Sequence, residues 1–111
     1  MKDFYRLQAR PTVVITTTSP RGIPNAAPFS FSSPMASRPT PLFGFCCEVE
    51  HDTWTNIRQN KEFVVNLVGE EFGAHMEKLE THYPYEVNEI KECGLTEAKS
   101  NRVSPPRIAE A

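Results

Sequence analysis

Two short segments carry the side chains with which this chain could hold a small molecule. The first reads Asn25-Ala26-Ala27-Pro28-Phe29-Ser30-Phe31-Ser32-Ser33. Its small residues would let a flat ligand lie against the backbone, while the asparagine and serine side chains offer hydrogen-bond donors and acceptors. The same residues are equally typical of a β-strand with one polar face. Physical reasoning on this segment alone favours that structural role.

The second segment surrounds the start of a predicted helix. Trp54 and Ile57, spaced i, i+3, indicate a short helix over residues 53–60. The N-terminus of a helix presents unpaired backbone N–H groups and the positive end of the helix dipole, which suit a phosphate. Thr53 could add a hydroxyl donor, and His51 could add a nitrogen that can be protonated.

An ordinary capped surface helix explains these residues as well. Asp52 or Thr53 stands where an N-cap is needed. A carboxylate at this position is awkward for an anion site, and Asp52 is more easily understood as the cap itself. Taken alone, the second segment therefore favours the ordinary helix.

The cysteine and histidine residues do not form a recognisable metal site or nucleophile. None lies in a Cys-x-x-Cys or His-x-x-x-His pattern, and a cysteine–histidine pair lacks any local signature. The residues concerned are Cys46, Cys47, His51, His75, His82 and Cys93. The chain also has no Walker A loop, no GxGxxG and no GxSxG motif. We therefore expect no metal ligands and no catalytic side chain.

The composition excludes two classes of partner. With a formal net charge of −2 and no Lys or Arg block longer than a pair, the chain lacks the charge pattern of a nucleic-acid-binding protein. No apolar run approaches the ~18 residues of a membrane span. Three cysteines make a poor disulfide framework, so we expect reduced thiols and a cytoplasmic protein.

Prolines and β-branched residues indicate the fold. Seven of the ten prolines lie between Pro11 and Pro41, which excludes long helices there and favours short strands joined by turns. We expect strands at 13–18, 25–31, 42–47 and 62–68, helices at 53–60 and 70–80, a helical turn at 87–90, a loop at 33–41 and a polar connection at 97–111. This order predicts a mainly β architecture, an antiparallel β-barrel with helical insertions.

The order of several short motifs along the chain is more specific than any one of them. The motifs are Arg10-Pro11 with Val13-Val14, Thr16-Thr17-Thr18, Asn25 to Ser30, Pro41-Leu42, Asp52-Thr53 with Asn56-Ile57, Glu62 to Leu67, Glu89, Gly94-Leu95-Thr96, Ser100 and Pro105-Pro106-Arg107-Ile108. In this order they resemble the flavin reductase-like, FMN-binding split-barrel family. The resemblance covers nearly the whole chain, which we treat as a single domain over residues 1–111.

The resemblance implies an antiparallel Greek-key split β-barrel that forms a homodimer, with FMN held near the subunit interface. The residues expected beside the ring and ribityl chain are Asn25, Ala27, Pro28, Phe29, Ser30, Phe31 and Ser32. Asp52 and Thr53 are expected near the phosphate, with Asn56 close by. Family members often carry a lysine where this chain has His51. A neutral imidazole gives a phosphate less charge, so affinity would be lower or would depend on pH near ~6.5.

The resemblance also implies an activity, which is that of an NAD(P)H-dependent flavin reductase or a related oxidoreductase. Hydride transfer is carried by the flavin, which agrees with the lack of a catalytic dyad in the sequence. Two alternatives remain open, a non-catalytic FMN-binding electron carrier and a truncated remnant without flavin. Family members continue past the motif that ends at Ile108, and we expect their further strands to close the barrel and add flavin and nicotinamide contacts.

Overall fold

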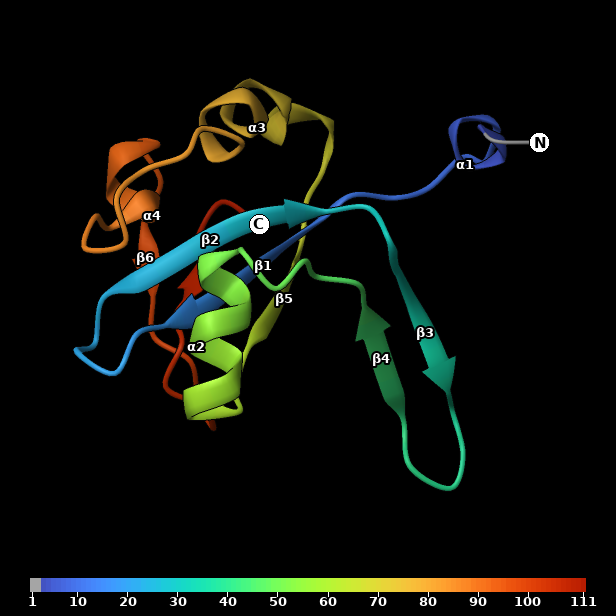
Figure 1. The fold of residues 1–111 in the computed structure, drawn as a ribbon, viewed down its shortest axis with the longest axis horizontal. Helices are drawn as coiled ribbons and strands as arrows, with labels where there is room; N and C mark the ends of the chain where they lie inside the picture. The colour runs from blue at the N-terminus through green and yellow to red at the C-terminus, as the bar shows by residue number, and fades with distance from the viewer. Residues whose placement is uncertain (1–2) are drawn as a thin grey trace.

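A three-stranded antiparallel sheet forms the centre of the molecule (Figure 1). The computed structural model describes residues 3–111. The strands of this sheet are β1 (Val13–Thr18), β2 (Pro24–Phe29) and β5 (Val64–Leu67), in the order β2–β1–β5. The β-branched residues of β1 suit a central strand, because their stiff side chains pack well on a pleated surface. The strands predicted at 13–18, 25–31 and 62–68 are confirmed, the last two with shifted ends.

The turn between β1 and β2 forms as its residues predict. Gly22 has a φ of +81°, a conformation that glycine adopts without strain, and its N–H donates to Ser19 O at 2.9 Å. The N–H of Ala26 points away from β1 and donates to Glu89. Because this direction alternates along an antiparallel strand, Pro24 and Pro28 also face away from β1, and their missing N–H groups leave the ladder intact.

A second hairpin extends away from the central sheet (Figure 1). It consists of β3 (Ser32–Ala36) and β4 (Leu42–Phe45). The loop predicted over 33–41 is therefore wrong at its start, because Pro34 lies in a strand that pairs on one side only, where a missing N–H is tolerated. The strand predicted at 42–47 exists as β4, but it pairs with β3 in this hairpin, and Leu42 is exposed.

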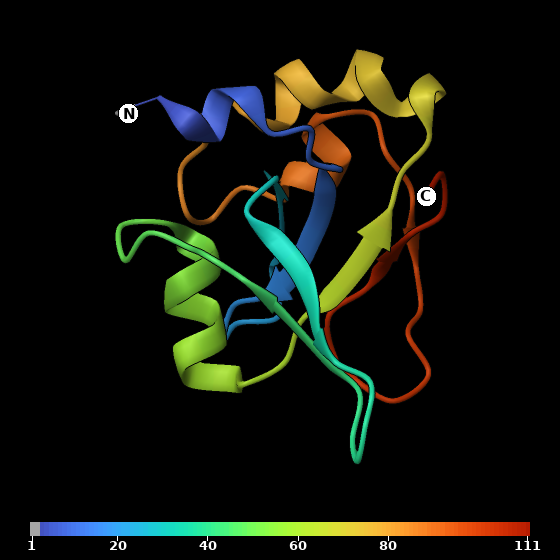
Figure 2. The same cartoon turned by 90° about the vertical axis from the view of Figure 1, so that its right-hand side faces the viewer.

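Apart from α1, the helices pack on the two faces of the central sheet. The helices are α1 (Phe4–Leu7), α2 (Asp52–Asn60), the 3₁₀ turn η1 (Glu70–Phe72), α3 (Gly73–Leu79) and α4 (Glu89–Glu92). In Figure 2, α2 and α3 lie on different sides of the central strands. The helix predicted at 53–60 is confirmed as α2, and the one at 70–80 is confirmed as η1 followed by α3. The helical turn predicted at 87–90 is α4, and the sequence analysis did not predict α1.

The C-terminal segment is not the polar connection that we expected at 97–111. It contains β6 (Glu97–Ala98) and β7 (Arg107–Ile108), which pair with each other. The side chain of Ile108 is buried, and its N–H donates to the side-chain oxygen of Asn66 on β5 at 2.9 Å. Contacts with a strand some forty residues away thus order a segment whose own composition is polar.

Two apolar cores follow from the alternation of side chains along β1. Val14 faces α3, α4 and the C-terminal segment, together with Ala26, Phe72, Leu79, Ile90, Cys93, Leu95 and Ile108. Val13 and Ile15 face the opposite side, where they pack with Phe29 and with the partly buried Phe43, Phe45 and Phe63. Both faces of the sheet are therefore covered, so the sheet presents its edges, and not its faces, at the surface.

The mainly β, antiparallel class that the sequence predicts is confirmed. Within residues 3–111 the strands form three separate sheets and not one closed barrel. In this part of the chain, no helix is both long enough and apolar enough to cross a bilayer.

Asn66 offers a test of how the C-terminal segment is held. Its Nδ2 donates to Val14 O at 3.0 Å and to Thr16 Oγ1 at 3.2 Å, and its Oδ1 accepts from Ile108 N–H. Asn66→Ala leaves buried groups without partners, so we expect the free energy of unfolding to fall by about 2–3 kcal/mol. Urea titration measures this loss. The matched control is Asn101→Ala at an exposed position, and an equal effect there would contradict the role given to Asn66.

Candidate functional site

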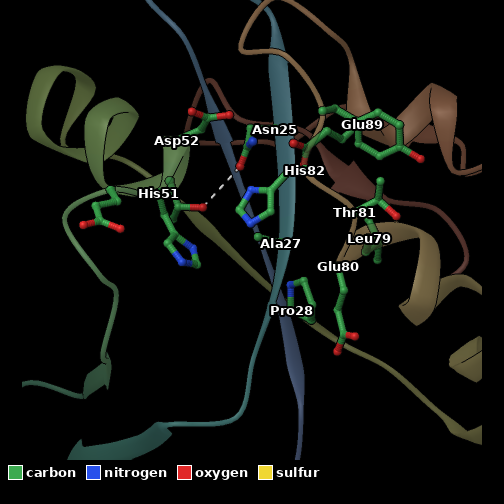
Figure 3. A pocket seen from close by; sticks show the side chains of 13 residues that line it. Asn25, Ala27, Pro28, His51, Asp52, Leu79, Glu80, Thr81, His82 and Glu89 are labelled. Atoms are coloured by element: carbon green, nitrogen blue, oxygen red, sulfur yellow. Dashed lines mark hydrogen bonds between the residues drawn. The ribbon is translucent and has the colours of Figure 1, made fainter.

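A cavity of about 230 Å³ lies along the outer edge of β2. The start of α2 forms one wall, and the segment that follows α3, together with α4, forms the other (Figure 3). Its lining residues are Asn25, Ala27, Pro28, Glu50, His51, Asp52, Thr53, Leu79, Glu80, Thr81, His82, Tyr83 and Glu89. The small-residue strand and the helix start, which are separate in the sequence, thus meet at one place.

The start of α2 offers backbone donors to this cavity. His51 is the N-cap residue, with extended φ and ψ of −77° and 145°, and its carbonyl accepts from Trp54 N–H and Thr55 N–H. The N–H groups of Asp52 and Thr53 precede these and have no carbonyl of the helix to bond. They lie at the positive end of the helix dipole, which favours an anion.

A side-chain bond holds the helix start against β2. Thr53 Oγ1 donates to Asn25 Oδ1 at 3.2 Å, and both residues are buried (Figure 3, dashed line). The Thr53 hydroxyl is therefore occupied within the chain. It positions the backbone N–H groups of the helix start beside the edge of β2.

Asn56 also belongs to this anchoring and does not line the cavity. Its Nδ2 donates to Thr17 Oγ1 at 3.0 Å, and its Oδ1 accepts from Tyr85 O–H at 2.6 Å. The side chain is buried, with 1% of its surface exposed. Both ends of the amide are thus used to dock α2 on β1, so the structure gives Asn56 a scaffold role.

A second cavity, of about 400 Å³, adjoins the first along β2 and the start of the following hairpin. It is lined by Pro28, Phe29, Ser30, Phe31, Cys46, Cys47, Glu48 and His51. Pro28 and His51 line both cavities, so the two adjoin along β2, and we refer to them together as the groove. Of the residues predicted from the sequence, this groove brings together Asn25, Ala27, Pro28, Phe29, Ser30, Phe31, His51, Asp52 and Thr53. Ser32 and Asn56 are not part of its lining.

Arg10 supplies positive charge at the second cavity. Its guanidinium lies 4.6 Å from the ring centroid of Phe31, and its Nη2 is 3.5 Å from Ser30 Oγ. Such stacking on an aromatic face is favourable for arginine. The sequence indicates Arg10 only as part of the Arg10-Pro11 motif, and nothing in its local spacing indicates that it approaches Ser30 and Phe31.

Glu89 is the main residue of the first cavity that sequence reasoning missed. The residue is 7% exposed, and its Oε2 accepts from the Ala26 N–H at 3.3 Å. Burial raises the pKa of Glu89 from 4.5 to about 7; the hydrogen bond from Ala26 opposes this shift, and the negative charge of Asp52 adds to it. The available signal was the family motif that contains Glu89, but only the packing of α4 on β2 places it in the site.

The first cavity carries more acidic than basic groups. Its lining contains four carboxyl groups, those of Glu50, Asp52, Glu80 and Glu89, and two imidazole groups, those of His51 and His82. Burial raises the pKa of Asp52, and the charges of both histidines oppose this shift. In the described part of the chain, no group of three His, Cys, Asp or Glu side chains is arranged to hold a metal ion. These carboxylates oppose an anion at the start of α2, so any anionic group there relies on the backbone N–H donors.

Comparison with known proteins identifies relatives over the whole site. The sequence model of the family described as "Flavin reductase like domain" matches residues 5–111. A protein of Aquifex aeolicus, named only as uncharacterized, is 40% identical over 106 residues, which are 92% of this chain and 54% of that protein. The chain thus spans about half the length of the curated relatives it matches.

Two solved structures share the fold at 29% sequence identity. Nitrilotriacetate monooxygenase component B from Bacillus cereus superposes with a TM-score of 0.87 over 99% of this chain and 58% of its own. The 2-nitrobenzoate 2-nitroreductase NbaA of Pseudomonas fluorescens gives 0.85 over 100% of this chain and 56% of its own. The arrangement of β2, α2 and α4 thus belongs to a fold that these proteins share.

The raised pKa of Glu89 makes the stability of the protein depend on pH. Its folded-state pKa of about 7 lies above the ordinary 4.5, so the folded protein holds this proton more tightly than the unfolded chain. The stabilisation is complete below pH 4.5 and is lost as the pH rises through about 7. We expect a loss of up to about 3 kcal/mol from this group.

Urea unfolding at several pH values measures this dependence. Glu89→Gln cannot ionise, so the difference in unfolding free energy between this variant and the wild type should grow as the pH rises. Glu92→Gln, at an exposed position on the same helix, is the control and should follow the wild type. A constant difference between Glu89→Gln and the wild type would show that Glu89 titrates normally.

Proposed function

The chain belongs to the flavin reductase-like family. We therefore propose that it binds FMN in the groove along β2 and acts as an NAD(P)H-dependent flavin reductase or a related oxidoreductase. The observation that carries this proposal is the meeting of the small-residue edge of β2 with the N-terminus of α2 in the first cavity, which the second cavity adjoins. The Greek-key split barrel is part of the proposal, since the antiparallel strands and their two cores agree with it.

The residues of the groove fit a flavin in shape and in donor chemistry. Ala27 and Pro28 leave the edge of β2 open to a flat ring, and the aromatic side chains of Phe29 and Phe31 lie further along the groove. The free N–H groups at the start of α2 suit the phosphate. The two cavities, at about 230 and 400 Å³, together provide the volume usual for a cofactor site.

In this proposal the cofactor carries the redox chemistry, and the chain binds and orients it. A bound flavin supplies a ring that accepts a hydride from a nicotinamide and passes electrons onward. The chain itself orients the ring through β2, and the Thr53–Asn25 bond keeps the phosphate donors in place. His51 lies between the two cavities and gives less positive charge than a lysine would, which favours weak or pH-dependent binding of the phosphate.

We also propose that the protein pairs as a homodimer. Large apolar side chains are exposed on α1 and along the β3–β4 hairpin; these are Phe4, Leu7, Phe31, Met35 and Leu42. Apolar side chains that cluster at one side of a small protein are typical of an interface. Phe31 also lines the second cavity, so a partner on this surface would border the proposed flavin site.

A substitution at the edge of β2 tests the proposed flavin site. Ala27 lines the cavity and also packs partly against the core of Val13, Ile15 and Phe29. Ala27→Leu narrows the cavity at the edge of β2, so we expect the affinity for FMN to fall at least roughly tenfold, about 1.4 kcal/mol, in a variant that melts like the wild type. Quenching of FMN fluorescence measures the affinity. Ala74→Leu, at an exposed position of α3, introduces the same side chain and should bind FMN like the wild type.

The same preparation separates the open alternatives. Bleaching of the bound flavin's visible absorbance by NADH or NADPH supports a reductase, whereas bound flavin that neither donor reduces supports an electron carrier. Absence of FMN binding by the wild type would refute the proposal. If Ala27→Leu bound FMN as well as the wild type, the flavin would have to lie elsewhere.

A further inference from the structure

Glu89 has one carboxyl oxygen that the chain does not use. Oε2 accepts from the Ala26 N–H at 3.3 Å. Among residues 3–111, no side-chain or backbone donor reaches Oε1. The residue lines the first cavity from α4, opposite the start of α2, and the Ala26 bond fixes its position beside Asn25 and Ala27 (Figure 3). The carboxyl group is therefore held at the wall of the groove, and its Oε1 is free to bind a ligand.

The charges around this carboxyl group favour its neutral form. The titratable groups that share its cavity or act on it come from α2, from the segment after α3 and from α4 itself. They are Glu50, His51, Asp52, Glu80, His82, Tyr83 and Cys93. No lysine or arginine is among them, and Asp52 acts on Glu89 with a like charge. A ligand that covered the cavity would remove the remaining water and disfavour the ionised form further.

We propose that Glu89 is a ligand-binding residue of the flavin site, which binds in its protonated form and donates the O–H of its free carboxyl oxygen to the polar edge of the flavin ring. This inference rests on the proposed function. A carboxylic acid kept neutral by its surroundings is a hydrogen-bond donor, and the carbonyl groups at the pyrimidine edge of a flavin are acceptors. An ionised Glu89 would present only acceptors to these carbonyl oxygens.

The proposal predicts the sign of a pH dependence. If only the protonated form binds well, the affinity for a flavin must fall as the pH rises through the pKa of Glu89, about 7. Each unit by which the ligand raises this pKa weakens binding roughly tenfold above both pKa values. A carboxylate that accepted the ring N–H would give the opposite sign.

Riboflavin is the appropriate probe, because it lacks the phosphate and is uncharged in this pH range. We would titrate the wild type, Glu89→Gln and Glu92→Gln with riboflavin by fluorescence from about pH 5.5 to about 8.5, on either side of the Glu89 pKa. The amide of glutamine keeps an acceptor for Ala26 and a permanent donor for the ring. Glu92 lies on the same helix at an exposed position and serves as the matched control.

The wild type and Glu92→Gln should bind riboflavin roughly tenfold more weakly at the high end of this range than at the low end. Glu89→Gln should keep the low-pH affinity throughout. His51 and His82 also line the cavity and are the alternative source of a pH dependence. Histidine protonation would leave the same pH dependence in Glu89→Gln, so this variant separates the two causes.

A direct measurement follows the proton without relying on activity. Carbon-13 NMR of labelled glutamate carboxyl groups should show one group with a raised pKa, absent in Glu89→Gln, which rises further when riboflavin is added. If riboflavin lowers this pKa or leaves it unchanged, Glu89 does not bind as a donor. If flavin binds with the same pH dependence in the wild type and in Glu89→Gln, this role is overturned and the proposed function stands. If no flavin binds at any pH, the proposed function fails first.

Discussion

The central constraint on this structure is that β1 is buried on both faces and yet carries hydroxyl groups. Thr16 and Thr17 are both 0% exposed, and they point to opposite sides of the sheet. A buried hydroxyl without a partner is costly. Thr16 and Thr17 each have one, whereas Thr18 Oγ1, at the end of β1, has none within residues 3–111. On one face, Thr16 donates to Pro106 O at 2.6 Å and accepts from Asn66. This demand ties the C-terminal segment to the central sheet.

On the other face, the need of the buried Thr17 hydroxyl group for a partner positions the helix of the candidate site. Thr17 accepts from Asn56, which in turn accepts from Tyr85, so α2 is docked by a chain of hydrogen bonds instead of an apolar seam. Buried polar networks of this kind specify one arrangement, because any shift leaves a group unsatisfied. With α2 held at this point, its first residues reach the edge of β2, where Thr53 bonds Asn25. The position of the groove thus follows from the hydrogen bonds that the buried Thr17 hydroxyl group of β1 requires.

The sequence could predict those parts of the fold that depend on local patterns. The β-branched run of β1 and the i, i+3 apolar pair of α2 are local, and both elements form where expected. The strand that contains Pro34 was missed because a proline counts against a strand unless its free edge is known. Most of the groove was accessible through the order of motifs, but the approach of Arg10 to Phe31 and Ser30 and the bond of Glu89 to Ala26 depend on packing.

The distribution of charge along the groove limits what it can hold. The acidic residues gather in the first cavity, whereas Arg10 lies at the far end beside Ser30. A helix N-terminus contributes only about half an elementary charge, so two ionised carboxylates facing it would outweigh its attraction for an anion. Burial raises the pKa of Glu89 to about 7, so this carboxyl group is partly protonated near neutral pH and opposes an anion less; burial also raises the pKa of Asp52. The desolvation that disfavours the ionised form of Glu89 therefore lowers the negative charge that a phosphate at the start of α2 would meet.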